Sequence, residues 1–245
     1  MSERIEGRNA VIEALRSGRE LERVFIAHGV KHDASLDEIR TLAQQAGVPV
    51  TGVDRVELDR ASERGHHQGV AAAAAEFVYA TLAEVVQRAE GRERSLVVLL
   101  DHVTDPGNLG AVIRSAEVAG ADGVIIAERR SAPVTTIVHK ASAGATAHLP
   151  VARVTNLVRA LDELKSAGFW VGGASERAEQ TLWEAPLDGR LVLALGAEGE
   201  GLSRLVAEHC DFLVGIPVNG QVDSLNVAQA ATVLAYEWVR RAQVC

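Results

Sequence analysis

Apolar runs alternate with amphipathic segments along most of the chain, and this alternation predicts strands and helices in turn. After residue 95, continuous apolar runs predict buried strands at Leu96–Leu100, Gly123–Ala127, Leu149–Val154, Phe169–Gly172, Leu191–Leu195 and Phe212–Ile216. Helical spacing predicts intervening helices near Asp105–Gly120, Thr136–Ala147, Thr155–Leu164, Ser203–Cys210 and Leu225–Arg241. Strands that are apolar on both faces indicate a mostly parallel α/β sheet covered by helices on either side.

The first 75 residues predict a separate, small α/β unit. Helices are expected at Arg8–Ser17, Leu36–Ala43 and Val56–Ala61, and strands at Val24–Ala27, Val48–Val53 and from Gln68 onward. Residues 76–94 then change character, because a short amphipathic helix, Thr81–Arg88, precedes the charged run Glu90–Arg94. This pattern predicts a domain at 1–75, a linker at 76–94 and a domain at 95–245. The adjacent His66 and His67 point apart, which favours two surface-loop histidines over a metal pair.

Composition narrows the class of protein. The chain has 245 residues, 47% of them apolar, which suits one large domain or two small ones and argues against disorder. No apolar run is long enough to span a bilayer, and the N-terminus lacks the apolar region of a signal peptide. Two isolated thiols, Cys210 and Cys245, fit a reducing compartment better than a disulfide framework. We therefore expect a cytoplasmic protein that does not associate with a membrane.

The formal net charge of −8 speaks, on average, against a nucleic-acid partner. An average can hide a local patch, and all but three of the basic residues are Arg, which binds phosphate bidentately. On composition alone, a GC-rich coding bias is the favoured explanation of the Arg content. Residues 1–75 hold ten basic and twelve acidic residues, so any nucleic-acid-binding face there must be local.

Three junctions that follow predicted strands could carry chemistry. Ligands of such sheets sit beyond the carboxyl ends of the strands, where backbone groups are free of the ladder. One junction is the polar loop Ile216–Asn226, which leads into the last helix; another is the turn with Gly196, Gly199 and Gly201, which contains Glu198. The turn matches neither the dinucleotide nor the P-loop signature, and a plain tight turn would also explain it.

The third junction, Asp101–Gly120, carries Asn108 in a first helical turn and Arg114 beside the small residues Gly110 and Ala111. Arg114 could bind phosphate or carboxylate bidentately, or it could form an ion pair with Glu117 on the same helix face. The residues alone leave both readings open.

Taken together, the three segments resemble the three motifs of the SpoU family of RNA ribose 2′-O-methyltransferases, part of the knotted SPOUT class. They read Asp101-x-x-x-Asp-Pro-Gly-Asn-Leu-Gly-Ala-x-x-Arg114, Leu195-Gly-x-Glu-Gly-x-Gly-Leu202 and Ile216-Pro-x-x-Gly-x-x-x-Ser-Leu-Asn-Val227. The resemblance covers residues 95–245. The N-terminal part resembles the small RNA-binding domain of the branch that modifies the peptidyl-transferase region of large-subunit ribosomal RNA, chiefly through Ile5-Glu-Gly-Arg-Asn-Ala-Val and His67-Gln-Gly-Val.

The resemblance implies a parallel-sheet domain with a deep trefoil knot, a small RNA-binding domain before it, and a homodimer formed through the knot region. It implies that S-adenosylmethionine is held largely by the backbone and that no metal takes part. The implied cofactor-binding residues are Gly196, Ile216, Leu225, Leu195, Gly199 and Pro217. The implied catalytic residues are Arg114, Asn108, Glu198, Ser224 and Asn226. The family commonly continues Ser-Val-Ala after the third motif; here Ala228-Gln229-Ala230 follows, which is expected to affect packing or the dimer face.

The role of Arg114 contains a chemical tension. A ribose 2′-hydroxyl must lose a proton as it attacks a methyl group, and family proposals make Arg114 the base. A free guanidinium stays protonated in water, so it is a poor base. Either a substrate phosphate assists, or Arg114 stabilises the developing alkoxide electrostatically. Asn108, Ser224 and Asn226 could position the hydroxyl.

The leading functional prediction is 2′-O-methylation of ribosomal RNA, at a guanosine of the large subunit, on free RNA or on a pre-ribosomal particle. Arg8, Asn9 and Arg16 are predicted to bind substrate, because they can line one side of the first helix. A transfer RNA 2′-O-methyltransferase is the substrate alternative. A catalytically idle RNA-binding assembly factor is an alternative of another class, disfavoured by the intact motifs. A nucleotide-binding oxidoreductase is disfavoured by the missing dinucleotide signature.

Overall fold

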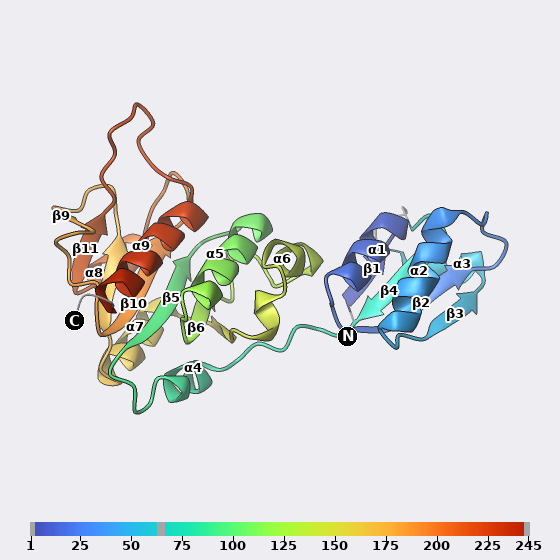
Figure 1. Ribbon diagram of the computed structural model, residues 1–245, viewed down its shortest axis with the longest axis horizontal. Coiled ribbons are helices and arrows are strands. Elements are labelled where there is room, and N and C mark those ends of the chain that lie inside the picture. Colours follow the sequence, from blue (N-terminus) through green and yellow to red (C-terminus); the bar gives the residue numbers. More distant parts are fainter. Residues whose placement is uncertain (1–2, 63–66, 243–245) are drawn as a thin grey trace. The chain divides into compact units, whose positions relative to one another are not determined.

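The computed structural model describes residues 3–62 and 67–242 of the chain. The chain divides after Val78 into two compact units, each with its own sheet (Figure 1). Unit 1 contains strands β1 (Glu3–Glu6), β2 (Leu21–Ala27), β3 (Val50–Val53) and β4 (Val70–Ala74), and helices α1 (Arg8–Arg16), α2 (Ala34–Gln45) and α3 (Arg55–Ala61). Its strand order is β1-β4-β2-β3, with β4 antiparallel to both neighbours and β3 parallel to β2.

Two features of unit 1 differ from the prediction. Strand β1 was not predicted, because only Ile5 of its four residues is apolar and buried; pairing with β4 makes it a strand. His67 was predicted at the surface and is buried, so that prediction is wrong for it. Its Nδ1 accepts a hydrogen bond from Gly69 N (3.0 Å) and its Nε2 lies 2.7 Å from Asp59 Oδ1, which closes the turn before β4. His66 lies outside the described residues.

Unit 2 is built on a seven-stranded sheet in its described residues, and every neighbouring pair of strands is parallel. The order is β7-β6-β5-β10-β8-β11-β9. The strands are β5 (Ser95–Asp101), β6 (Gly123–Ala127), β7 (Val151–Val154), β8 (Trp170–Ala174), β9 (Gln180–Thr181), β10 (Arg190–Gly196) and β11 (Phe212–Gly215). This confirms the predicted parallel α/β class; the trefoil knot stays a prediction.

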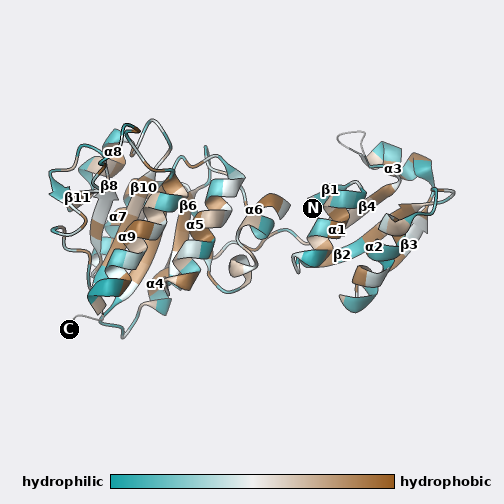
Figure 2. Ribbon diagram, turned by 45° about the horizontal axis from the view of Figure 1, so that its top comes forward, coloured by the Kyte–Doolittle hydropathy of each residue, from teal (hydrophilic) through white to brown (hydrophobic). Residues whose placement is uncertain are grey.

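Helices cover both faces of this sheet. They are α4 (Leu82–Arg88), α5 (Pro106–Val118), α6 (Thr136–Ala141), α7 (Leu157–Ser166), α8 (Arg204–Glu208) and α9 (Val227–Ala242), with a 3-10 turn at Ala145–Ala147. Buried residues of α4, α7 and α8 pack on one face in a single apolar cluster with β5, β6, β8 and β10. Helix α5 packs between α6 and α9 on the other face (Figure 1). Figure 2 shows the apolar central strands and the polar outer faces of the helices.

The boundary between the units differs from the predicted linker at 76–94. Val85 and Ala89 of the α4 region are fully buried in the core of unit 2. Tyr79 also belongs to this unit, because its hydroxyl accepts a hydrogen bond from Val134 N (2.8 Å). The linker prediction is therefore wrong from Tyr79 onward. Its amphipathic helix is real, but its apolar side is buried against the sheet.

Two predicted helix ends also move. Asn156, rather than Thr155, caps α7, because the Asn156 side chain accepts a hydrogen bond from Arg159 N (3.1 Å). The predicted helix Thr136–Ala147 ends at Ala141, since Ala143 and Gly144 adopt positive φ values of 50° and 86° that interrupt it.

Candidate active site

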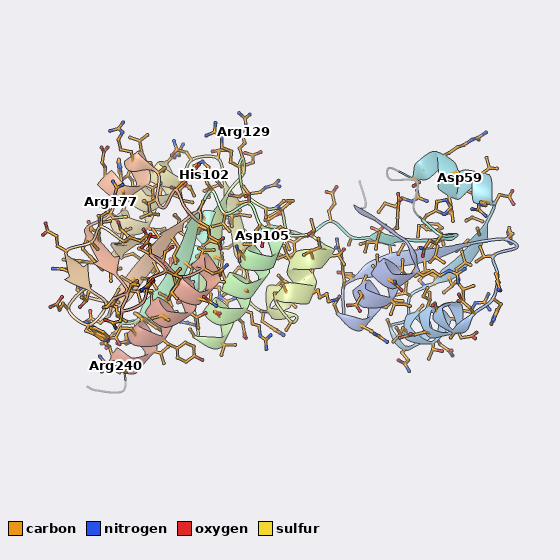
Figure 3. All side chains as sticks on the ribbon, turned by 90° about the horizontal axis from the view of Figure 1, so that it is seen from above. Asp59, His102, Asp105, Arg129, Arg177 and Arg240 are labelled. Carbon is orange, nitrogen blue, oxygen red and sulfur yellow. The ribbon has the colours of Figure 1, made fainter. Side chains whose placement is uncertain are left out.

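The strand register brings the three junctions to one edge of the sheet. Gly196 at the end of β10 is aligned with Asp101 at the end of β5. Strand β8 lies between β10 and β11 and aligns Gly173 with Ala194 and Leu213, so Ile216 also emerges at this edge. The loops after β5 and β6 carry His102, Asp105 and Arg129, which are labelled in Figure 3. The expected convergence at the carboxyl ends of the strands is thus present.

Asp101 locks the first junction to the second. It ends a fully buried strand, and its Oδ2 accepts a hydrogen bond from Ser203 N (2.7 Å), which begins α8. His102 Nδ1 lies against the other carboxylate oxygen, and His102 itself has a φ of 60°. Asp105 then caps α5 by accepting from Asn108 N (2.7 Å), which places Asn108 in the first turn as predicted.

The glycine turn of the second junction is closed on itself. Gly201 N donates to Ala197 O (2.8 Å), and a Cβ on Gly196 would lie 1.9 Å from the carbonyl carbon of Gly201. Any side chain at Gly196 would therefore push the turn open. Gly199 and Gly201 have φ values of 78° and 69°, a region that other residues rarely enter. The turn holds Glu198 at its exposed tip.

Three predicted catalytic residues, one from each motif, meet through their side chains. Asn108 Nδ2 donates to Glu198 Oε1 (2.9 Å), and Asn226 Nδ2 donates both to Glu198 Oε1 (2.5 Å) and to Asn108 Oδ1 (2.8 Å). Asn226 Oδ1 accepts from Ala228 N (2.9 Å) at the start of α9. The carboxylate therefore orients two amides against each other, and both Asn226 amide protons are used within the chain.

The other two predicted catalytic residues lie apart from this group. Ser224 is exposed in the loop before α9 and bonds to none of the three. Arg114 is exposed on α5, six residues after Asn108, which is about 9 Å farther along the helix axis and on another side of it. Arg114 forms no hydrogen bond or ion pair with any described residue, so the alternative pairing with Glu117 is absent.

The predicted cofactor-binding residues lie on β10, on the glycine turn and on a loop whose backbone is not hydrogen-bonded to the described residues. Leu195 is buried in β10, whereas Gly199, Pro217 and Leu225 lie on the two loops. Between Ile216 and Leu225 the backbone makes no hydrogen bond with the described residues, so its N–H and C=O groups are open to a ligand. Figure 1 shows this loop projecting between β11 and α9.

The predicted substrate-binding residues lie on α1 of unit 1. Arg8 is largely covered; it pairs with Asp33 and donates to Lys31 O (3.3 Å). Arg16 is exposed and pairs with Glu38 of α2. Asn9 is exposed. Both Arg side chains therefore connect α1 to the α2 region, which is a structural role that sequence reasoning missed.

Sequence reasoning also assigned no role to Asp101, Ser203 or Cys210. The available signal for Asp101 was an acid at the end of a wholly apolar strand. Cys210 packs against β8, where a Cβ on Gly173 would come within 2.7 Å of its sulfur. Burial raises the pKa of the Cys210 thiol to about 12, so it stays protonated and is a poor nucleophile at neutral pH.

The described part of the chain contains neither a metal-ligand cluster nor a membrane-spanning helix. No group of three or more His, Cys, Asp or Glu residues there is arranged to hold a metal ion. None of the helices built from residues 3–62 and 67–242 is both long and apolar enough to cross a membrane.

Comparison with known proteins identifies the family to which these motifs belong. Residues 95–236 match the SpoU rRNA methylase family, and residues 4–80 match the RNA 2′-O ribose methyltransferase substrate-binding domain. The chain belongs to the SpoU methylase family. It is 44% identical to a TrmH-family tRNA/rRNA methyltransferase of Bacillus subtilis, YacO, over 96% of this chain and 94% of that protein.

Solved structures of SpoU enzymes have the same architecture. AviRb from Streptomyces viridochromogenes, in complex with AdoMet, aligns with a TM-score of 0.71 at 27% identity, over 99% of this chain and 91% of AviRb. The AdoMet-bound rRNA methyltransferase of Sinorhizobium meliloti gives 0.65 at 27%, over 98% and 87%. The A. aeolicus TrmH/SpoU tRNA modifying enzyme gives 0.56 at 26%, over 66% and 83%. This SpoU methylase therefore aligns over nearly its whole length with two of them and over about two thirds with the third.

Proposed function

We propose that this SpoU methylase transfers the methyl group of S-adenosylmethionine to a ribose 2′-hydroxyl of ribosomal RNA, at a guanosine of the large subunit. The observation that carries the proposal is the meeting of Asn108, Glu198 and Asn226 beside the unbonded backbone of residues 216–225. One residue from each family motif contributes to that group, which supports an active enzyme over the idle-factor alternative.

The site fits S-adenosylmethionine in its chemistry. Gly196 leaves no room for a side chain, and the loop Ile216–Leu225 offers backbone donors and acceptors that suit an adenine ring and a ribose. When bound there, the cofactor supplies a methyl group on a sulfonium centre. Residues Leu195, Gly196 and Gly199 would hold it from the β10 side, and Ile216, Pro217 and Leu225 from the β11 side.

The chain's own residues would orient the 2′-hydroxyl and stabilise the negative charge that develops on its oxygen. The 2′-oxygen forms a C–O bond to the methyl carbon as the S–C bond breaks, and the hydroxyl proton leaves toward a substrate phosphate or water. Arg114 has no partner in the described chain, so its guanidinium is available to hold that phosphate and to stabilise negative charge on the oxygen. Glu198 keeps the Asn108 and Asn226 amides in fixed orientations, and Ser224 would complete the pocket from its loop.

A homodimer is part of the proposal, and the outer face of α5, α6 and α9 supports it. Large apolar side chains are exposed there, with exposed fractions of 61% for Val118, 58% for Ile137, 38% for Val233 and 46% for Tyr236. Large apolar side chains exposed on helices that pack together favour association with a second copy. Arg114 is exposed one helical turn before Val118 on α5, so a partner subunit packed on this face would lie beside it.

Ribosomal RNA is favoured over transfer RNA by the extent of the similarity. The substrate-binding match covers unit 1. The rRNA methyltransferase from S. meliloti aligns with 98% of this chain, whereas the tRNA modifying enzyme from A. aeolicus aligns with 66%.

The test uses RNA from a strain that lacks the gene. Purified protein and S-adenosylmethionine are incubated with its total RNA, its transfer RNA and its ribosomal particles, and ribose methylation is mapped. We expect one new 2′-O-methylguanosine in large-subunit RNA, on free RNA or on particles. Methylation confined to transfer RNA would establish the alternative substrate, and S-adenosylmethionine binding without methylation of any RNA would contradict the proposal.

A further inference from the structure

Unit 1 contains a pocket of about 560 Å³ between the carboxyl end of β2, the start of α2 and the edge strand β3. This volume lies within the roughly 300–1,000 Å³ of small-ligand pockets. Its floor is apolar. Ile26 and Leu36 are buried, and Val50 is 41% exposed although it is a valine in a strand. A large apolar side chain left open in a hollow suggests that something covers it.

The rim of the pocket holds one guanidinium and two imidazoles. It carries His28, His32 and Arg40, and the lining holds no carboxylate among the described residues. This contrasts with unit 1 as a whole, where acidic residues outnumber basic ones. Arg40 forms no hydrogen bond or ion pair with a described residue, whereas His32 lies 3.2 Å from Asp37 just outside the lining. The pocket therefore pairs an apolar floor with one unneutralised guanidinium.

The His28 ring is held in place by a glycine. A Cβ on Gly52 would lie 2.7 Å from His28 Cε1, so the ring rests against the backbone of β3 where no other residue would leave room. The loop that carries His28 and His32 is held against α1, because Arg8 pairs with Asp33 and donates a hydrogen bond to Lys31 O. The wall of the pocket is thus preformed.

We propose that this pocket binds one unpaired nucleotide of the substrate RNA, a proposal that rests on the proposed function of the chain. The base lies on the apolar floor against the His28 ring, and Arg40 contacts a phosphate. Unpaired RNA bases stack on aromatic rings in this way, and a guanidinium matches phosphate geometry. An apolar, planar base joined to an anionic phosphate is the ligand that fits an apolar floor with a cationic rim. In this arrangement Arg8 is a positioning residue that holds the loop.

The experiment uses the full-length protein and an unmodified transcript of bacterial large-subunit ribosomal RNA. Affinity is measured at several salt concentrations for the wild type, Arg40→Ala, His28→Ala and Val50→Trp, which fills the pocket. Arg60→Ala is the matched control, because Arg60 is an exposed arginine of α3 that does not line the pocket. Thermal unfolding followed by circular dichroism, compared with the wild type, reports that unit 1 of each variant is folded.

We expect the His28 and Val50 variants to bind the transcript roughly tenfold more weakly, the size of one lost base stack. Arg40→Ala should weaken binding and lower the salt slope by about one, while Arg60→Ala leaves both near wild type. Crosslinking with 4-thiouridine-containing transcript should join RNA to residues 26–52.

Two results would overturn the inference and leave the proposed function standing, provided that the wild type methylates the transcript. One is that the pocket variants bind the transcript within twofold of the wild type. The other is that Arg60→Ala loses as much RNA affinity as Arg40→Ala. A wild type that binds S-adenosylmethionine but neither binds nor methylates ribosomal RNA would instead remove the proposed function, and this inference with it.

Discussion

At the scale of single residues, the site separates groups that are already paired from one that is not. Asn108, Glu198 and Asn226 satisfy one another within the chain, so their arrangement exists before any substrate arrives. Arg114 has no partner among the described residues. A preorganised group of neutral amides suits orientation, whereas an uncommitted guanidinium suits charge that develops during the reaction.

This distinction predicts the behaviour of Arg114 variants. Arg114→Ala should abolish methyl transfer and leave S-adenosylmethionine affinity nearly unchanged, because Arg114 lies away from the loops at Gly196 and Ile216. Loss of an interaction made only in the transition state lowers kcat. Arg114→Lys separates charge from shape: partial activity would indicate that charge suffices, and none would indicate planar bidentate contact. Single-turnover methylation measures the rate of methyl transfer, and cofactor titration measures the affinity for S-adenosylmethionine. A near-normal methylation rate in Arg114→Ala would refute the catalytic role of Arg114.

Glu237 provides a second prediction at this scale. It is buried on α9, and hydrogen bonds from Arg240 and then Arg241 lower its pKa from 4.5 to about 2. A depressed carboxylate pKa contributes stability above pH 4.5, and this contribution is lost as the pH falls toward 2. Glu237→Gln should therefore lower the free energy of unfolding at pH 7 by on the order of 2 kcal/mol, and the difference from wild type should shrink between pH 4.5 and pH 2.

Urea unfolding at a series of pH values measures this difference. The matched control is Glu163→Gln, which removes an exposed i,i+4 pair with Arg159 and should change stability by less than about 0.5 kcal/mol. A Glu237→Gln deficit that is independent of pH would show that the arginines do not stabilise the ionised form.

At the scale of elements, the approach of α5 to α6 depends on one glycine. A Cβ on Gly110 would lie 2.5 Å from Ala141 Cβ and 2.8 Å from Val138 O. The backbone oxygen cannot move aside alone, so the two helices would have to separate. Since α5 also carries Asn108 and Arg114, the position of α6 bears on the site.

Gly110→Ala therefore sets two effects against each other. Alanine favours a helix by about 1 kcal/mol over glycine, while overpacking costs about 1–3 kcal/mol. We expect net destabilisation, because the contact includes backbone atoms that cannot move aside. We also expect slower methyl transfer, because α5 would be displaced. Gly220→Ala is the control for stability, since a Cβ there meets nothing within 4 Å. A Gly110→Ala protein more stable than wild type in urea would show that the helices have room.

At the scale of the whole molecule, the chain separates into units at Val78 rather than after the charged run at Glu90–Arg94. Helix α4 completes one face of the parallel sheet through Val85. Arg94 also belongs to unit 2, because its guanidinium lies 4.6 Å from the centre of the Trp238 ring. The division of labour between the units is best tested at this boundary.

A fragment of residues 79–245 should bind S-adenosylmethionine and form a dimer, but should lose affinity for ribosomal RNA relative to the full chain. A fragment of residues 95–245 should be less stable by at least about 2 kcal/mol, since removing α4 uncovers apolar core. Calorimetry, solution mass and RNA binding compare the two. Equal stability would contradict the role of α4, and a 79–245 fragment that methylates RNA as well as the full chain would show that unit 1 is not the substrate reader.

The local pattern of the sequence determined the α/β class, most strands and helices, and the three motifs, because hydrophobic period, caps and glycine turns are properties of neighbouring residues. Only the tertiary structure decided that α4 belongs to unit 2, that His67 is buried, and that Arg8 and Arg16 are paired with acidic residues. It also decided that Asn108, Glu198 and Asn226 bond to one another while Arg114 and Ser224 stay apart. These contacts join residues far apart along the chain, so they depend on strand order and loop course, which no local pattern encodes.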